Sequence, residues 1–276
     1  MKHKRVVAKN SVGEVLLVGC EGAGKTLLCR HLHKIAKGDS AALQAATQPS
    51  IGVEFVDLQH PQRSHSFTLR EVGGMMQPVW SRYFEECSAL ILMADSATVE
   101  GLSCAAVELY NVLGSQALSS KRILLLLNQR DRDGALPEPS AQMLIGLPAL
   151  RATNQAVAER LQVLPVSALS GEKLTDVLDW CVDSCLDFRQ QAALAAEAAR
   201  AAEAAKVAQS KAEVRNTKTA AKAFVKAEKA AAAAQVQAER AAAKEEAKTS
   251  RRAAAGTRQP RLRFWRRRQK APLPEI

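Results

Sequence analysis

The sequence predicts an α/β fold with a mainly parallel sheet, and two observations carry that prediction. Short apolar segments alternate with helix-like segments over residues 14–189, as in strands joined by crossover helices. The segment ILLLL at 123–127 is apolar throughout, as expected of a central strand that is covered on both faces. We therefore expect six strands flanked by helices.

Each expected element follows from its local pattern. Strands are expected where short β-rich apolar runs occur, at 14–18, 53–58, 67–72, 89–93, 123–127 and 163–166. Helices are expected between and after them, at 25–36, 78–87, 99–113, 139–144 and 172–190.

The composition changes abruptly after residue 190. Residues 1–189 have a net charge of −1, whereas residues 190–276 have a net charge of +12. We divide the chain into a short basic segment (1–13), a folded domain (14–189), an Ala/Lys/Glu-rich segment (190–250) and a basic tail (251–276).

The Ala/Lys/Glu-rich segment favours a solvated helix, because alanine and the long charged residues are strong helix formers. Fully helical, it would extend roughly 80–90 Å. A partly disordered linker is the alternative. A coiled coil is less favoured, since the large apolar residues keep no heptad register: Leu194, Val207, Val214, Phe224, Val225 and Val236.

Several classes of protein are disfavoured. The sequence has no apolar run of about 18 residues, which a membrane-spanning helix requires. The N-terminus has no apolar segment of a secretory signal, and Lys2 occupies the position where N-myristoylation needs glycine. Six scattered cysteines without a C-x-x-C pair predict reduced, mostly buried thiols.

A phosphate-binding loop is the clearest motif. The expected strand EVLLV is followed by GCEGAGKT and then a helical pattern, which matches G-x-x-x-x-G-K-[ST] in its proper context. Glycines let backbone N–H groups face phosphates, and the helix N-terminus adds positive potential. Lys25 would reach the β- and γ-phosphates and Thr26 would bind Mg²⁺. We therefore predict that these residues of the loop and the start of the helix bind the nucleotide: Gly19, Glu21, Gly22, Ala23, Gly24, Lys25, Thr26 and Leu27.

Guanine is the base that the sequence favours. Asn128 and Asp131 form N-x-x-D after the buried strand, and a carboxylate at Asp131 can accept from both N1–H and the 2-amino group of guanine. In the later segment PVSALSG, the N–H of Ala168 could donate to guanine O6 while Ser167 holds the loop. Guanine-binding domains with this motif usually have a lysine at the position of Gln129, and the stem of that lysine packs against the face of the purine. An ATP-using protein is the disfavoured alternative.

These motifs together resemble the small GTPases, and within them the ADP-ribosylation factor branch. The resemblance covers about residues 14–189. It rests on Glu21 in the phosphate loop, on QPSIGVEF, which resembles the switch I segment, and on REVGGMMQPVWSRYF, which resembles switch II with Trp80 and Tyr83. The Arg-Glu-x-Gly-Gly form without glutamine looks most like the divergent ADP-ribosylation factor-like 16 subgroup.

The resemblance implies a metal site and a phosphate sensor. Besides Thr26, it implies that Ser50 gives a hydroxyl to Mg²⁺, that Glu71 acts beside the metal, and that the Gly74 N–H contacts the γ-phosphate. Serine replaces threonine at position 50 and glutamate replaces aspartate at position 71. The expected cofactors are GTP or GDP and Mg²⁺.

The residue that departs furthest from the family is Met75, at the position of the water-orienting glutamine. A thioether accepts hydrogen bonds only weakly, so we expect slow intrinsic hydrolysis and name no certain catalytic residue. Gln77 is more consistent with a surface residue than with a substitute catalyst. Whether the chain is an enzyme stays open at this point.

The C-terminal tail adds a cluster of basic residues around Phe264 and Trp265. We favour an anionic membrane over nucleic acid as its partner. A nuclear import signal and a solvated tail without a dedicated partner are the other interpretations.

The resulting hypothesis is an Arf-like guanine-nucleotide switch, with a monomeric GTPase domain, that recruits effectors in its GTP form. The resemblance implies activating and exchange factors, membrane or ciliary traffic, and a cytoplasmic or peripheral-membrane location, with the nucleus as an alternative. The second hypothesis is a non-hydrolysing, GTP-bound scaffold whose tail binds membrane or RNA.

Overall fold

The chain forms a six-stranded sheet in a computed structural model that describes residues 10–39, 43, 48 and 50–256. The strands are β1 (Ser11–Gly19), β2 (Val53–Gln59), β3 (Ser66–Val72), β4 (Ala89–Asp95), β5 (Arg122–Asn128) and β6 (Leu161–Pro165). Their order in the sheet is β2-β3-β1-β4-β5-β6, and only the β2–β3 pair is antiparallel. The predicted fold class is therefore confirmed.

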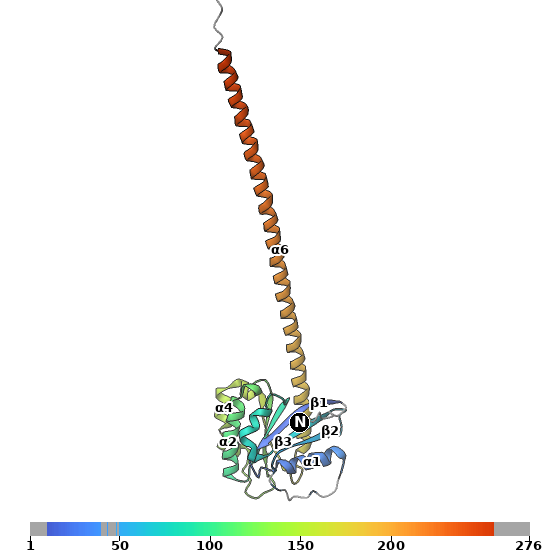
Figure 1. Cartoon of the computed structure of the whole chain (residues 1–276). Helices are drawn as coiled ribbons and strands as arrows, with labels where there is room; N and C mark the ends of the chain where they lie inside the picture. The colour runs from blue at the N-terminus through green and yellow to red at the C-terminus, as the bar shows by residue number, and fades with distance from the viewer. Residues whose placement is uncertain (1–9, 40–42, 44–47, 49, 257–276) are drawn as a thin grey trace, which may run out of the picture. The chain divides into compact units, whose positions relative to one another are not determined.

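Helices cover both faces of the sheet. They are α1 (Lys25–Lys37), η1 (Gly74–Tyr83), α2 (Val99–Gly114), η2 (Gln116–Leu118), α3 (Glu138–Ile145), α4 (Leu147–Thr153), α5 (Gln155–Arg160) and α6 (Leu174–Gly256). One core lies against α1 and the first turns of α6, and the other lies against α2 to α5 and η1. Figure 1 shows α1 and α2 on opposite sides of the sheet.

The alternation of side chains along β1 explains why one strand serves both cores. Val15 and Leu17 join the core under α1 and α6, whereas Leu16 and Val18 join the core under α2. Successive side chains of a strand point to opposite faces, so an apolar run with both faces covered buries every residue. The same holds for β5, where all of Ile123–Leu127 are buried.

Two helical regions differ from the prediction. The segment expected as a helix at 78–87 is the 3₁₀ helix η1, which begins earlier, at Gly74, and contains Pro78. Proline has no N–H, so it cannot continue the hydrogen bonding of a helix interior. The short helices α4 and α5 were not predicted. Each has about two turns or fewer, which is too short for a clear periodic signal.

The last helix, α6, begins in the folded domain and continues far beyond it in the chain. Its buried residues at helical spacing, among them Leu174, Val177, Cys181 and Cys185, pack into the core under α1. After Arg189 its described side chains are exposed, and high helix propensity replaces burial as the reason for the helix. The structure therefore supports the helical interpretation of this segment over the disordered one.

The chain divides into two units, Met1–Ala199 and Arg200–Ile276. None of the helices in the part of the chain that the structure describes is long and apolar enough to cross a bilayer. Most of the predicted basic tail, including Phe264 and Trp265, lies at 257–276 and so outside the described residues.

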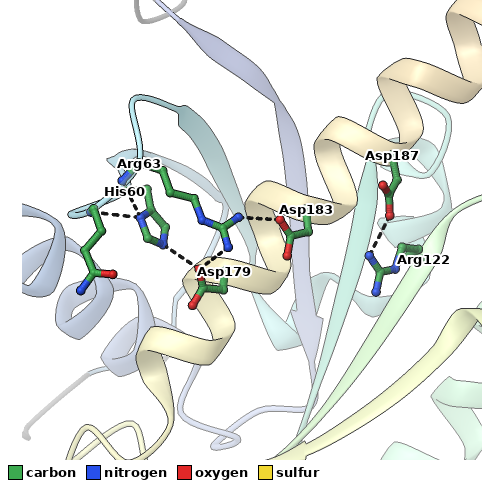
Figure 2. Close-up of polar contacts among 7 residues, drawn as sticks. His60, Arg63, Arg122, Asp179, Asp183 and Asp187 are labelled. Atoms are coloured by element: carbon green, nitrogen blue, oxygen red, sulfur yellow. Dashed lines mark hydrogen bonds and ion pairs between the residues drawn. The ribbon is translucent and has the colours of Figure 1, made fainter.

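The loop between β2 and β3 is attached to the start of α6 by charged side chains (Figure 2). Arg63 contacts both Asp179, at 2.8 Å, and Asp183. His60 is buried, its Nδ1 accepts from the backbone N–H of Arg63 at 3.1 Å, and its Nε2 lies 3.2 Å from Asp179. The hairpin loop and α6 therefore hold each other in place.

A disulfide joins Cys20 and Cys104, which corrects the expectation that all six thiols are reduced. Cys20 follows β1 and Cys104 lies in α2, which follows β4, and these two strands are neighbours in the sheet. Their sequence separation of 84 residues concealed this proximity. The other four cysteines, Cys29, Cys87, Cys181 and Cys185, are buried free thiols, as expected.

Burial also makes two of the free thiols unreactive. It raises the pKa of Cys87 to about 11 and that of Cys185 to about 12. Because the thiolate is the reactive form, both side chains remain neutral and inert near pH 7.

We expect Cys104→Ser to lower the free energy of unfolding by roughly 4 kcal/mol under oxidising conditions, because the disulfide restricts the unfolded chain. Urea unfolding of the wild type and the variant measures the difference. Addition of an excess of a dithiol provides the control, since it should bring the wild type close to the variant. An equal stability of the two proteins without reductant would show that the bond does not form in solution.

Candidate functional site

The loop between β1 and α1 forms the centre of the site. Lys25 is 6% exposed, and its ammonium donates to the carbonyl oxygens of Gly19 at 2.8 Å and Cys20 at 3.0 Å. Burial lowers the pKa of Lys25, and the negative charge of nearby Glu71 opposes that shift. The loop thus holds a buried cation at the N-terminus of α1, where anions are favoured.

Glycine at position 24 is required by both conformation and space. Gly24 has φ 94°, in the left-handed region that favours glycine. A Cβ there would lie 2.4 Å from the amide nitrogen of Asn128. Asn128 is buried and donates through Nδ2 to the carbonyl of Ala23 at 2.8 Å. The end of β5 therefore packs directly on the phosphate loop.

Three oxygen-bearing side chains meet beside Lys25. The hydroxyl of Thr26 lies 2.8 Å from that of Ser50 and donates to Oε1 of Glu71 at 2.6 Å. Glu71 is 1% exposed, and among the described residues its Oε2 is buried without a hydrogen-bond partner. Two hydroxyls and a carboxylate form the hard-oxygen donor set that Mg²⁺ prefers. All three predicted metal residues are thus brought together.

The start of η1 closes this pocket. A Cβ on Gly74 would lie 2.6 Å from the backbone nitrogen of Glu21, so only glycine allows the approach to the loop. The carbonyl of the preceding Gly73 accepts from the buried Trp80 indole at 3.2 Å. The pocket has a volume of about 160 Å³, and its lining residues include Gly22, Lys25, Glu71, Gly74 and Met75.

The residues at the glutamine position and just after it differ in surroundings. Met75 lines the pocket yet is 61% exposed. Gln77 donates to the carboxylate of Glu108 on α2 at 3.0 Å. Gln77 is exposed and its amide is bonded to α2, which agrees with the predicted surface residue.

The predicted base-recognition residues lie in two adjacent loops. Ser167 donates to Asp131 Oδ1 at 2.6 Å, so the hydroxyl orients the exposed carboxylate. The N–H of Ala168, which we assigned to guanine O6, donates to Asn128 Oδ1 at 2.8 Å in this structure. The contact to O6 remains a prediction. Leu27, assigned to the nucleotide, lies in the first turn of α1 and packs partly against the core.

Two residues contribute to the site in ways that the motifs did not show. His31 on α1 hydrogen-bonds through Nδ1 to the carbonyl of Ala168 at 2.8 Å. Gln129 has φ 66° and donates to the carbonyl of Gly22 at 2.9 Å. Both contacts join segments more than 100 residues apart, so no local sequence pattern signals them.

A scan against protein families matches residues 2–185 to the ADP-ribosylation factor family. The chain belongs to the ADP-ribosylation factor family. The resemblance noted from the switch segments is thereby confirmed.

Individual relatives agree with this assignment. Human ADP-ribosylation factor-like protein 16 is 31% identical over 172 residues, which cover 61% of this chain and 84% of that protein. Yeast (Saccharomyces cerevisiae) ADP-ribosylation factor-like protein 1 is 27% identical over 171 residues, which cover 61% and 85%. Each of the two alignments therefore leaves about two fifths of this chain uncovered.

A solved structure shows the same fold. The Arl6 small GTPase from Trypanosoma brucei, with a bound nucleotide analogue, superposes with a TM-score of 0.51. The match covers 62% of this chain and 96% of that one at 16% identity. The family match ends at residue 185, within α6, so most of this helix lies beyond it.

We expect Asn128→Ala to destabilise the domain by about 2–4 kcal/mol, because it leaves a buried carbonyl and a buried N–H without their partner. Urea denaturation of the ligand-free protein measures this. Asn111→Ala, which removes a side-chain amide from α2 that contacts Glu108 at 3.4 Å, is the control and should cost less than about 1 kcal/mol. Equal losses in the two variants would contradict a special role for Asn128.

Proposed function

We propose that this Arf-family protein is a Mg²⁺-dependent guanine-nucleotide switch with slow intrinsic GTP hydrolysis. The observation that carries the proposal is the meeting of Thr26, Ser50 and Glu71 beside the phosphate loop and Lys25. The three residues come from α1, the segment before β2, and β3, so their convergence is a property of the tertiary structure.

The residues present fit a metal ion. Thr26 and Ser50 would bind it through their hydroxyls, and Glu71 would supply a nearby negative charge through Oε2, which accepts no hydrogen bond from the described residues. When bound, Mg²⁺ would neutralise charge on the β- and γ-phosphates. Lys25 would contribute a second positive charge to the same oxygens.

Guanine selectivity would come from Asp131. Its carboxylate is exposed, and Ser167 hydrogen-bonds one oxygen and so limits its rotation. A fixed pair of acceptor oxygens matches the adjacent N1–H and 2-amino donors of guanine, and adenine lacks that donor pair.

Slow hydrolysis follows from the switch II side chains. Orientation of the attacking water contributes much of the catalysis in phosphoryl transfer. Met75 has no group that can orient water, and Gln77 is held by Glu108. A partner protein would then supply the missing group, and an exchange factor would reload the nucleotide.

Effector recruitment would use the exposed apolar side chains of the switch segments. Ile51 is 84% exposed, Met75 61% and Phe55 47%. Met75 lines the pocket, and Ile51 directly follows the lining residue Ser50, so the positions of these two side chains would depend on the bound nucleotide. From its Arf-like relatives we infer a role in membrane or ciliary traffic and a cytoplasmic or peripheral-membrane location, with the basic tail on an anionic bilayer.

A non-hydrolysing scaffold is the second candidate, and the engaged Gln77 favours it. In that case GTP would be a permanent ligand of the domain. Retention of intact GTP over many hours, with or without candidate activating proteins, would distinguish the scaffold from the switch.

We expect Asp131→Asn to weaken GTP binding at least about tenfold and to favour XTP over GTP. The asparagine amide would oppose the 2-amino group of guanine but could donate to the 2-carbonyl of xanthine. Competition binding among GTP, XTP and ATP measures this. Asp133→Asn removes the same charge two residues away and should leave the preference unchanged. ATP preferred by the wild type would overturn the assignment.

We expect Met75→Gln to accelerate single-turnover GTP hydrolysis roughly ten- to hundredfold, because the amide can orient the attacking water. Phosphate release from preloaded protein is the readout. Met143→Gln, at an exposed methionine on α3, is the matched control. No acceleration in Met75→Gln would mean that glutamine alone cannot restore the site.

A further inference from the structure

The exposed part of α6 carries an apolar seam that follows no heptad register. Val207, Val214, Val225 and Val236 are 43–52% exposed. With about 100° of rotation per residue, all four lie within roughly 20° of one line along the helix. The last three are 11 residues apart, and an 11-residue repeat keeps a straight or slightly right-handed seam.

Alanines fill the gaps between these valines. Ala221, Ala232 and Ala243 fall within about 40° of the same line. Lys218 lies at its edge, where the long side chain can pack its methylenes and keep its charge in water. The seam is therefore narrow and small, and a second helix could approach it closely.

Basic and acidic residues lie on opposite sides of this seam. Ten of the thirteen basic residues of 200–252 lie on one flank, between roughly 20° and 100° from the valine line: Arg200, Lys211, Arg215, Lys218, Lys222, Lys226, Lys229, Arg240, Lys244 and Arg251. All six acidic residues lie on the other flank, between roughly 40° and 160°: Glu203, Glu213, Glu228, Glu239, Glu245 and Glu246.

The charged flanks of two copies of this helix are complementary only when the helices run parallel. If two copies pair in parallel about a twofold axis along the seam, the basic flank of each copy faces the acidic flank of the other. If they pair antiparallel, basic faces basic and acidic faces acidic. A solvated spacer or a purely basic surface would not require acids on one flank and bases on the other.

We propose that residues 207–247 of α6 pair in parallel with the same segment of a second copy of this chain. The valine seam lies between the helices, and the two charged flanks set the orientation. The paired length is on the order of 60 Å at 1.5 Å per residue. The weak apolar content makes this a reversible association rather than an obligate one.

Sedimentation equilibrium of the full-length protein from about 1 to 100 μM tests the seam. We expect a monomer–dimer equilibrium that Val225→Asp weakens at least about tenfold. Ala223→Asp adds the same charge on the opposite face and should change the dissociation constant less than about twofold. Circular dichroism checks that both variants keep their helix content.

Orientation is tested by cross-linking with a short bismaleimide. Ala243→Cys places a thiol at one end of the seam, where parallel copies bring the two thiols together and antiparallel copies separate them. We expect covalent dimers from Ala243→Cys and only singly labelled chains from Ala241→Cys, on the far face. Higher salt should reduce cross-linking, since exposed charges are screened.

Several results would overturn the proposal. A chain that stays monomeric throughout the concentration range has no such pairing. Equal weakening by Val225→Asp and Ala223→Asp would trace the effect to the helix itself rather than to the seam. Dimers that fail to cross-link at Ala243→Cys would contradict the parallel arrangement. If the chain stays monomeric and Val225→Asp abolishes its binding to vesicles of anionic lipid, the seam contacts a bilayer rather than a second copy.

Discussion

The side-chain amide of Asn128 connects two loops of the nucleotide site with the end of β5. Its Nδ2 donates to the phosphate loop at Ala23, and its Oδ1 accepts from Ala168 in the loop after β6. Both bonds are buried, where an unpaired polar group costs far more than it does in water. The ends of β1, β5 and β6 are therefore held in one arrangement, and the predicted phosphate and base contacts depend on it.

Further contacts near Asn128 hold the loop between β1 and α1 in place. Gln129 holds Gly22, Gly74 closes against Glu21, and the disulfide ties Cys20 to α2. The loop presents backbone groups at fixed positions at a helix N-terminus, which suits the binding of phosphate groups. At the corner predicted to bind metal, Thr26, Ser50 and Glu71 come from separate segments and meet through their side chains. The backbone also joins two of these segments, because the N–H of Gly73 donates to the carbonyl of Gly52 at 3.0 Å. A change in the ligand at that corner would act on the segments that carry Ser50 and Glu71.

The two units of the chain are stabilised by different interactions. Residues up to Ala199 form a domain stabilised by burial on both faces of a sheet. From Arg200 the described residues are exposed, and the helix persists through intrinsic propensity and the pattern of charge. The first unit belongs to a family of nucleotide switches, and the second carries the helix segment that we propose to pair with a second copy. A parallel pair of α6 helices would raise the local concentration of two nucleotide domains around each other.

The sequence by itself determined the fold class, the strand positions to within a few residues and the phosphate loop, and it singled out the residues that are predicted to bind metal. Each of these rests on local periodicity, on a contiguous motif, or on segments that resemble a known family. Tertiary structure alone decided the pairing of Cys20 with Cys104, the bond from His31 to Ala168, and the engagement of Gln77 by Glu108. It also decided that β2 lies at the edge, antiparallel to β3, and that the β2–β3 loop is attached to α6. The physical reason is common to these cases: the partners are distant in sequence, and only the order of the strands in the sheet and the packing of helices on its faces bring them within bonding distance.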